Sequence, residues 1–237
     1  MILNIAILMP TLNEEQGLKK TLATIPYTYF QKKNWQLTLY IIDGLSTDNT
    51  QQIAKQHNVH VILEPRKGYG RAYKTGLHHL TEDIIITGDA DATYPFDCIP
   101  QYLDLFLQEN LDFMTTNRFA QLTKGSMSVK HRFGNLILAW TVRILFWVHI
   151  KDSQSGMWIL KKEALSKIQP LEAFNDGMPF SEEIKIEMFT NKKIRAREIP
   201  STLYLREGNV KLESFSDGWK NLLFLFKKRV TMHHVQK

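Results

Sequence analysis

Residues 84–95 have the sequence IIITGDADATYP, in which an apolar, β-branched run ends in two carboxylates one residue apart. The run predicts a buried strand, because β-branched side chains pack well on a pleated sheet. Successive side chains of a strand point to opposite faces, so a turn near Tyr94 and Pro95 is needed to bring Asp89 and Asp91 toward one point. Two carboxylates there suit Mg²⁺ or Mn²⁺ and leave coordination positions for substrate phosphates. The same pattern also fits a solvated turn that binds nothing.

Composition indicates one folded domain of ordinary size. The chain has 237 residues, of which 43% are hydrophobic, enough for one substantial α/β core. The single cysteine, Cys98, excludes an intramolecular disulfide and a multi-cysteine metal site, which favours a reducing compartment. Residues 1–10 lack the basic region and cleavage site of a signal peptide and are too short to span a bilayer. We therefore expect a cytoplasmic protein whose first strand lies in this segment.

Short apolar segments alternate with helical patterns in the first half of the chain, which predicts a mostly parallel sheet covered by helices. The expected strands are residues 4–9, 37–42, 59–63 and 84–87, and the expected helices are residues 14–25, 48–57 and 71–80. Ligands of such sheets lie beyond the carboxyl ends of the strands, so the loops after these four strands form the candidate site. Polar loops alone do not identify a site.

Four segments, in order, resemble the motifs of family 2 glycosyltransferases of GT-A fold, in the branch of polyprenyl-phosphate hexosyltransferases related to dolichol-phosphate glucose and mannose synthases. They are PTLNEE at 10–15, DGLSTD at 43–48, KGYGRA at 67–72 and GDADATYP at 88–95. The resemblance implies an α/β GT-A fold, a single Rossmann-like domain with a mostly parallel central sheet flanked by helices, plus a C-terminal amphipathic helix. The expected division is 1–212 for the glycosyltransferase domain and 213–237 for a basic membrane-interface segment.

The resemblance also assigns the donor site. Gly44 and Leu45 depart from the family's Asp-Asp-Gly-Ser pattern, so the contact with the base is expected to rest on Asp43 alone. Asp89 and Asp91 are expected to hold Mg²⁺ or Mn²⁺, which would stabilise the charge that grows on the leaving diphosphate. The residues expected to bind the nucleotide sugar are Pro10, Thr11, Asn13, Glu14, Glu15, Asp43, Ser46, Lys67, Gly68, Arg71, Asp89, Ala90 and Asp91.

Two later segments resemble the sugar side of the family's site. They are DSQSGMW at 152–158 and GMPFSEE at 177–183, the latter similar to the glucose-type branch except that Pro179 replaces a Glu. The resemblance implies that Glu183 binds sugar hydroxyls, and the expected catalytic residues are Asp91, Glu183 and Arg118. The alternative for Glu182 and Glu183 is a first helical turn stabilised by the helix dipole.

An acceptor phosphate would be bound by cations. A polyprenyl monophosphate has a second pKa near ~6, so at neutral pH it is mostly ionised and needs positioning more than a general base. By resemblance, the residues expected to bind it are Arg118, Arg132, Arg206 and Lys211. The alternative for each arginine is an ordinary surface ion pair.

Two segments are expected to meet a membrane surface. Residues 134–150 are almost wholly apolar but contain Arg143 and are short for a span, which favours an interfacial or half-buried helix. Residues 206–237 have seven Lys or Arg against three Asp or Glu, and their apolar residues follow a helical period. The expected stripe is Phe215, Trp219, Leu222, Leu223 and Phe226, with Lys227, Lys228 and Arg229 facing anionic head groups; a core helix is the alternative. No zinc spacing, RNP-like motif or helix-turn-helix pattern supports a nucleic-acid partner.

The expected function is an inverting, metal-dependent transfer of a hexose from a nucleotide sugar to a polyprenyl phosphate. UDP-glucose is the favoured donor among UDP-hexoses and GDP-mannose, and the enzyme is expected to lie peripherally on the inner, cytoplasmic face of the membrane. One alternative is a family 2 transferase with another donor or a soluble or saccharide acceptor. A sugar nucleotidyltransferase is disfavoured because its Gly-rich N-terminal loop is absent, and a non-catalytic nucleotide-sugar sensor is the last alternative.

Overall fold

The structure is a computed structural model that describes residues 2–208 and 214–235. Its strands are β1 (Asn4–Thr11), β2 (Gln36–Asp43), β3 (His60–Leu63), β4 (Ile84–Thr87), β5 (Phe113–Leu122), β6 (Trp158–Lys161) and β7 (Ala196–Leu203). Its α-helices are α1 (Glu15–Thr24), α2 (Tyr27–Lys32), α3 (Thr50–Gln56), α4 (Tyr69–His79), α5 (Ile99–Gln108), α6 (Val129–Phe146), α7 (Phe180–Thr190) and α8 (Ser214–Val235). Each of the seven elements predicted in the first half of the chain is present, with ends within two residues of the prediction.

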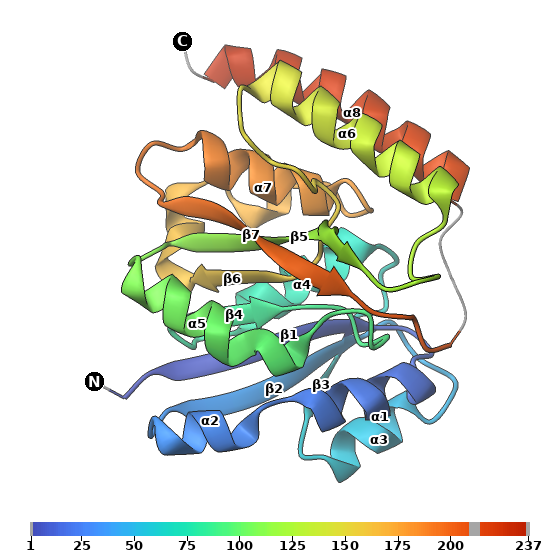
Figure 1. Ribbon diagram of the computed structural model, residues 1–237, viewed down its shortest axis with the longest axis vertical. Helices are drawn as coiled ribbons and strands as arrows, with labels where there is room; N and C mark the ends of the chain where they lie inside the picture. Colours follow the sequence, from blue (N-terminus) through green and yellow to red (C-terminus); the bar gives the residue numbers. More distant parts are fainter. Residues whose placement is uncertain (1, 209–213, 236–237) are drawn as a thin grey trace.

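Within the described residues, one seven-stranded sheet crosses the molecule in the order β3-β2-β1-β4-β6-β5-β7 (Figure 1). Only β6 runs antiparallel to its neighbours, β4 and β5, in this sheet. The other pairs are parallel, so the mostly parallel α/β sheet expected from the sequence is confirmed.

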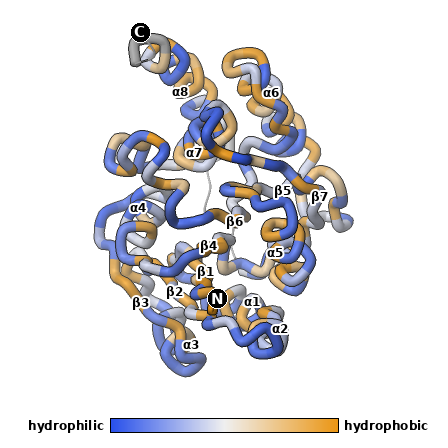
Figure 2. Tube along the Cα trace, turned by 90° about the vertical axis from the view of Figure 1, so that its left-hand side faces the viewer, coloured by the Kyte–Doolittle hydropathy of each residue, from blue (hydrophilic) through white to orange (hydrophobic). Residues whose placement is uncertain are grey.

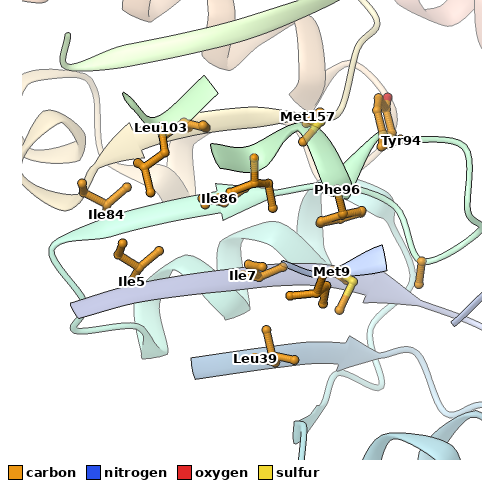
Figure 3. Packing of buried hydrophobic residues seen from close by; sticks show 14 of the residues in the cluster. Ile5, Ile7, Met9, Leu39, Ile84, Ile86, Tyr94, Phe96, Leu103 and Met157 are labelled. Atoms are coloured by element: carbon orange, nitrogen blue, oxygen red, sulfur yellow. The ribbon is translucent and has the colours of Figure 1, made fainter. Parts of the chain in front are cut away.

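Alternate residues of β1 contribute to two separate cores. Ile5, Ile7 and Met9 belong to the cluster beneath α1 and α5, part of which is drawn in Figure 3. Ala6 and Leu8 belong to the cluster on the opposite face, beneath α4 and α7. Because side chains alternate along a strand, β1 needs apolar residues at every position to be buried on both faces. The sheet is therefore the middle layer, and its carboxyl edge is left for the site.

Helices α6 and α8 lie together at one end of the molecule, beyond α7, as both Figure 1 and Figure 2 show. A third apolar cluster joins these helices, with Leu138 and Val142 from α6, Ile186 from α7 and Leu225 from α8. Trp140 on α6 is 58% exposed, so the half-buried helix expected at 134–150 is confirmed, although it begins and ends earlier. Among the described residues, none of the helices combines the length and apolar character needed to cross a bilayer.

The C-terminal helix is present, but one face differs from the prediction. Trp219, Leu223 and Phe226 are each more than half exposed, as expected of an outward stripe. Leu222 instead packs into the cluster between α6, α7 and α8, so its place in the outward stripe was predicted wrongly. The side chain of Phe215, together with Lys211 and the predicted boundary at 212, lies outside what the structure describes.

Lys228 also lies on the inner face of α8. It is 6% exposed, and its ammonium group pairs with Glu183 and Glu187 of α7. The prediction that Lys228 faces lipid head groups is therefore wrong. The reason is helical register, since Lys228 follows the fully buried Leu225 by three residues and so shares its face.

Candidate active site

The loops after β1 and β2 are joined side by side at the carboxyl edge of the sheet. Thr11 pairs with Asp43 in the sheet, and its hydroxyl donates to the Asp43 carboxylate at 3.0 Å. The Asn13 N–H donates to Ser46 Oγ at 2.8 Å, and Asn13 Oδ1 accepts the Thr47 N–H at 2.7 Å. The two predicted nucleotide-binding segments therefore form one unit, with Pro10 one residue before Thr11 in β1.

Two acidic residues of the first segment extend this unit toward α1 and α3. The Glu14 N–H donates to Thr50 Oγ1 at 2.8 Å, and the Glu15 N–H donates to Asp48 Oδ2 at 3.1 Å. The Glu15 carboxylate in turn accepts the Asn49 N–H at 3.1 Å. These bonds tie the start of α1 to the loop that precedes α3.

Asp43 is fully buried, and four donors surround its carboxylate. These are the Thr11 hydroxyl, the N–H and hydroxyl of Ser46, and the Gln51 side-chain amide. Since a buried carboxylate must find such partners, Asp43 fixes the shape of the loop after β2. Its direct contact with a nucleotide base stays a prediction.

The turn that carries Asp89 and Asp91 is clamped by α1. A Cβ atom on Gly17 would lie 2.6 Å from both the Ala90 carbonyl oxygen and Asp91 Cα, so only glycine allows the helix to approach so closely. The Ala92 N–H donates to the Thr21 hydroxyl at 3.0 Å, and Ala92 has a left-handed φ of 66°. The turn expected beyond β4 is therefore present and held from α1, a contact that sequence reasoning missed. A glycine inside a predicted helix was the available signal.

Asp91 already binds a cation of the protein itself. One of its oxygens accepts the N–H and hydroxyl of Thr93, at 3.1 and 2.6 Å. The other accepts a hydrogen bond from Arg206, whose second Nη atom donates to Glu14 Oε1 at 2.7 Å. The predicted acceptor cation Arg206 thus lies across the predicted metal position.

Asp89 lies on the same turn as Asp91 but has fewer hydrogen-bond donors around its carboxylate. Its carboxylate accepts a 3.3 Å hydrogen bond from the Tyr69 hydroxyl. Burial, and then the like charge of Asp91, raise the pKa of Asp89 to about 7.

The two aspartates suit a divalent cation. The Asp91 carboxylate binds the Arg206 guanidinium. Asp89 has a raised pKa because the positive charge near it does not offset its burial and the charge of Asp91. Mg²⁺ and Mn²⁺ prefer oxygen ligands and commonly take one or two carboxylates plus substrate phosphates and water. In the part of the chain that the structure describes, no group of three or more His, Cys, Asp or Glu side chains could hold a metal. As two oxygen ligands on one turn, Asp89 and Asp91 fit a metal that shares its coordination with a diphosphate.

The loop between β3 and α4 packs tightly on residues 172–177. A Cβ atom on Gly68, whose φ is 136°, would lie 2.2 Å from the Asp176 carbonyl oxygen. The Arg71 guanidinium pairs with Glu172 and Asp176, whereas Lys67 is exposed. The diphosphate contact predicted for Arg71 stays a prediction, because this side chain is held by other partners here.

Arg118 and Asp152 form a buried bidentate pair. Arg118 Nε donates to Asp152 Oδ2 at 2.7 Å, and Arg118 Nη2 donates to Oδ1 at 2.9 Å. Asp152 is fully buried, which by itself would raise its pKa, but the charge and hydrogen bonds of Arg118 outweigh burial and lower it. Arg118 therefore anchors the loop before β6. Arg132, another residue predicted to bind the acceptor phosphate, is exposed near the start of α6.

The two glutamates at the start of α7, Glu182 and Glu183, differ in how many of their carboxylate oxygens have hydrogen-bond partners. Glu183 Oε1 accepts hydrogen bonds from the Gln169 amide and Lys228, both at 3.1 Å, and Oε2 accepts the Asn175 N–H at 2.8 Å. Glu182 is fully buried, and one of its oxygens accepts a 2.7 Å bond from Gln154, while the other has no partner among the described residues. Burial raises the pKa of Glu182 well above its ordinary value. The contacts therefore favour Glu182 over the predicted Glu183 as the residue able to accept a ligand.

Comparisons with known proteins show which family and fold this chain resembles. The chain matches the family model described as "Glycosyl transferase family 2" over residues 6–169. The low-salt glycan biosynthesis hexosyltransferase Agl6 of Haloferax volcanii is 30% identical over 223 residues, which are 93% of this chain and 52% of that protein, so this chain spans about half its length. The dolichyl-phosphate hexose transferase of the same organism is 29% identical over 217 residues, 91% of this chain and 89% of that protein. Glucosyl-3-phosphoglycerate synthase from Mycobacterium tuberculosis, in complex with Mn²⁺, UDP and phosphoglyceric acid, matches the fold with a TM-score of 0.70 at 17% identity, over 96% of this chain and 78% of that one.

Proposed function

This chain belongs to glycosyl transferase family 2 and has the GT-A fold, and from this premise we propose that it transfers a hexose from a nucleotide sugar to a polyprenyl phosphate. The observation that carries the proposal is the carboxyl edge of the sheet, where Asp89 and Asp91 lie on one turn and Arg206 binds both Asp91 and Glu14. The names of both Haloferax relatives support a hexose as the transferred group. The name of the second, the dolichyl-phosphate hexose transferase, also supports a polyprenyl-phosphate acceptor.

We propose an inverting displacement, as the resemblance to polyprenyl-phosphate hexosyltransferases implies. The acceptor phosphate oxygen attacks the anomeric carbon, the bond to the diphosphate breaks, and the diphosphate leaves with the bonding electrons. Mg²⁺ or Mn²⁺ bound by Asp89 and Asp91 would supply the charge that stabilises the leaving diphosphate. Glu182 would form a hydrogen bond to a sugar hydroxyl through its unpartnered oxygen, and Arg132 and Arg206 would attract the acceptor phosphate.

UDP-glucose is our preferred donor, because the segment that contains Gly177, Met178 and Phe180 is similar to the glucose-type branch. The test is a panel of UDP-glucose, UDP-N-acetylglucosamine and GDP-mannose against undecaprenyl and dolichyl phosphates, with mass spectrometry of the lipid product. A glycosylated lipid phosphate supports the proposal. Transfer only to soluble saccharides, or release of pyrophosphate from a nucleoside triphosphate and a sugar phosphate, would contradict it.

Lys67 provides a prediction for the donor site. Lys67→Met should weaken the affinity for UDP with Mn²⁺ by about tenfold to a hundredfold, since a hydrogen bond to a charged group contributes about 1.5–3 kcal/mol. The side chain is exposed, so the free energy of unfolding should not change. Isothermal titration calorimetry measures the affinity, and Lys19→Met, at an exposed lysine of α1, is the matched control. Equal UDP affinity in the Lys67 variant and the parent would remove Lys67 from the donor site.

We also propose that α6 and α8 hold the enzyme on the inner, cytoplasmic face of a membrane. Both helices expose apolar side chains at spacings of three or four residues, which places them along one face of each helix. On α6 these are Val129, Phe133, Ile137, Trp140 and Ile144, and on α8 they are Trp219, Leu223, Phe226 and Val230. A helix with such a face lies in the interface between lipid head groups and acyl chains.

The membrane proposal predicts the effect of removing one tryptophan from each helix. The double change Trp140→Ser and Trp219→Ser should weaken binding to anionic vesicles by on the order of a hundredfold, since burial of a large apolar side chain contributes about 1.5–3 kcal/mol. Both side chains are more than half exposed, at 58% and 59%, so thermal unfolding should stay unchanged. Vesicle flotation measures the binding. Unchanged flotation, or loss of an oligomer instead, would show that these faces do not bind lipid.

A further inference from the structure

We propose that Lys228 of α8 is a positioning residue for the donor loop, here defined as residues 67–71. It acts through Glu183 and through a bridging segment, defined as residues 169–177, that lies between α7 and the donor loop. The inference rests on the proposed function, whose donor site it deepens. It gives the C-terminal helix a part in the arrangement of the active site as well as in the proposed membrane contact.

The first step is the burial of the Lys228 ammonium group. Its Nζ atom lies 3.1 Å from Glu183 Oε1, 2.6 Å from Glu187 Oε1 and 5.6 Å from the centre of the Phe174 ring. With only 6% of the residue exposed, water cannot replace these partners. A buried ammonium group with two carboxylate partners keeps all three side chains in one arrangement.

The second step leads from Glu183 to the bridging segment. Glu183 Oε2 accepts the Asn175 N–H at 2.8 Å, and Oε1 accepts the Gln169 side-chain amide at 3.1 Å. The carboxylate therefore binds the segment at two points six residues apart. Because its ammonium group pairs with this same carboxylate, Lys228 supports the segment by fixing the orientation of Glu183.

The third step leads from the bridging segment to the donor loop. The Gly70 N–H donates to the Gly177 carbonyl at 3.2 Å, and the Arg71 N–H donates to the Asp176 carbonyl at 2.9 Å. A Cβ atom on Gly70 would lie 2.3 Å from the Asn175 carbonyl oxygen, so the two backbones are in direct contact.

The contacts then reach the metal carboxylates. Tyr69, which directly precedes Gly70 and Arg71 in the donor loop, donates its hydroxyl to Asp89 at 3.3 Å. Displacement of the bridging segment would therefore move the donor loop relative to Asp89. A misplacement of about 1 Å at a reacting group lowers a rate by up to about a hundredfold.

Glu187 offers a matched control within the same cluster. It pairs with the same ammonium group, one turn further along α7, yet its carboxylate has no hydrogen bond to the bridging segment among the described residues. Glu187→Gln removes one of the two ion pairs of Lys228 and leaves Glu183 bound. Lys228→Met removes both ion pairs and leaves the Glu183 carboxylate without its cation.

The first test needs no ligand. Hydrogen exchange of the full chain, read at the amides of Gly70, Arg71 and Asn175, should be on the order of tenfold faster in Lys228→Met than in the parent, because their closed arrangement is destabilised locally. Glu187→Gln should leave the exchange rates of these amides unchanged. Lys228→Arg, which keeps the positive charge, should show the rates of the parent. Equally fast exchange at these amides in Lys228→Met and Glu187→Gln would overturn the proposal. Faster exchange over the whole chain would do so too, because Lys228 would then only stabilise the fold in general.

The second test is turnover with the donor that the panel identifies. Lys228→Met should lower kcat/KM for the nucleotide sugar by about tenfold to a hundredfold, with KM for the lipid phosphate unchanged and rescue by Lys228→Arg. If Lys228→Met does not fold, exchange is compared between Glu183→Gln and Glu187→Gln, which each remove one ion pair of Lys228. Equal exchange at Gly70, Arg71 and Asn175 in these two variants would contradict action through Glu183. If the parent transfers no hexose in the panel, the proposed function fails, while the exchange result still decides the positioning role.

Discussion

Replacing Asp91 with asparagine is expected to lower hexose transfer by on the order of 10³-fold, because a fixed charge at the leaving group is among the largest contributions to such catalysis. The amide keeps an oxygen for the N–H and hydroxyl of Thr93 but loses the charge that faces Arg206 and the proposed metal position. Titration calorimetry of Mn²⁺ in the presence of UDP should show a matching loss of metal affinity.

The folded state of the Asp91→Asn variant should remain intact. The clamp by α1 uses the backbone of this turn, through Gly17 and Thr21, and not the Asp91 carboxylate. Circular dichroism and the midpoint of thermal unfolding therefore serve as the control. Transfer and Mn²⁺ affinity equal to those of the parent, in a folded variant, would rule out Asp91 as a metal ligand.

Replacing Asp152 with asparagine is expected to lower the free energy of unfolding by about 3–5 kcal/mol, because it leaves the buried Arg118 guanidinium without its charge partner. Asp152 is fully buried, and the Arg118 side chain is 13% exposed. Urea unfolding measures the change. Because the pKa of Asp152 is lowered in the folded state, the contribution of the pair is complete above about pH 4 and is lost only as the pH falls below that value.

A surface pair provides the comparison for Asp152. Lys33 and Asp104 lie 3.2 Å apart with side chains 45% and 53% exposed, so Asp104→Asn should change the free energy of unfolding by less than about 1 kcal/mol. If the two variants were destabilised equally, burial would not be what makes the Arg118–Asp152 pair important, and Arg118 would be available to a ligand at little cost.

Most of the sheet could be predicted because local pattern and burial agree there. β1 is apolar at consecutive positions since both of its faces are covered, and β4 shows the same run before its carboxylates. The rule that ligands lie beyond the carboxyl ends of parallel strands then placed the loops after β1, β2 and β4 together. The bonds from Thr11 to Asp43 and from Asn13 to Ser46 join the first two loops, and Arg206 binds both Glu14 and Asp91.

The partners of the charged residues could not be predicted in the same way. Arg71 was expected at a diphosphate and pairs with Glu172 and Asp176, about a hundred positions along the chain. Lys228 was expected to face anionic lipid head groups and is buried against Glu183. In both cases the residue type and its helix were identified, but the segment packed against that helix was unknown.

The sequence by itself determined the alternation of strands and helices, the carboxylates at the end of β4 and the amphipathic character of α8, because each depends on residues close together in the chain. Only the tertiary structure decided which charges meet, as with Arg206 and Asp91 or Lys228 and Glu183, which are 115 and 45 positions apart. The physical reason is that a long charged side chain reaches several neighbours of similar energy. Its partner is therefore selected by how the helices and loops pack, and local sequence carries no record of that packing.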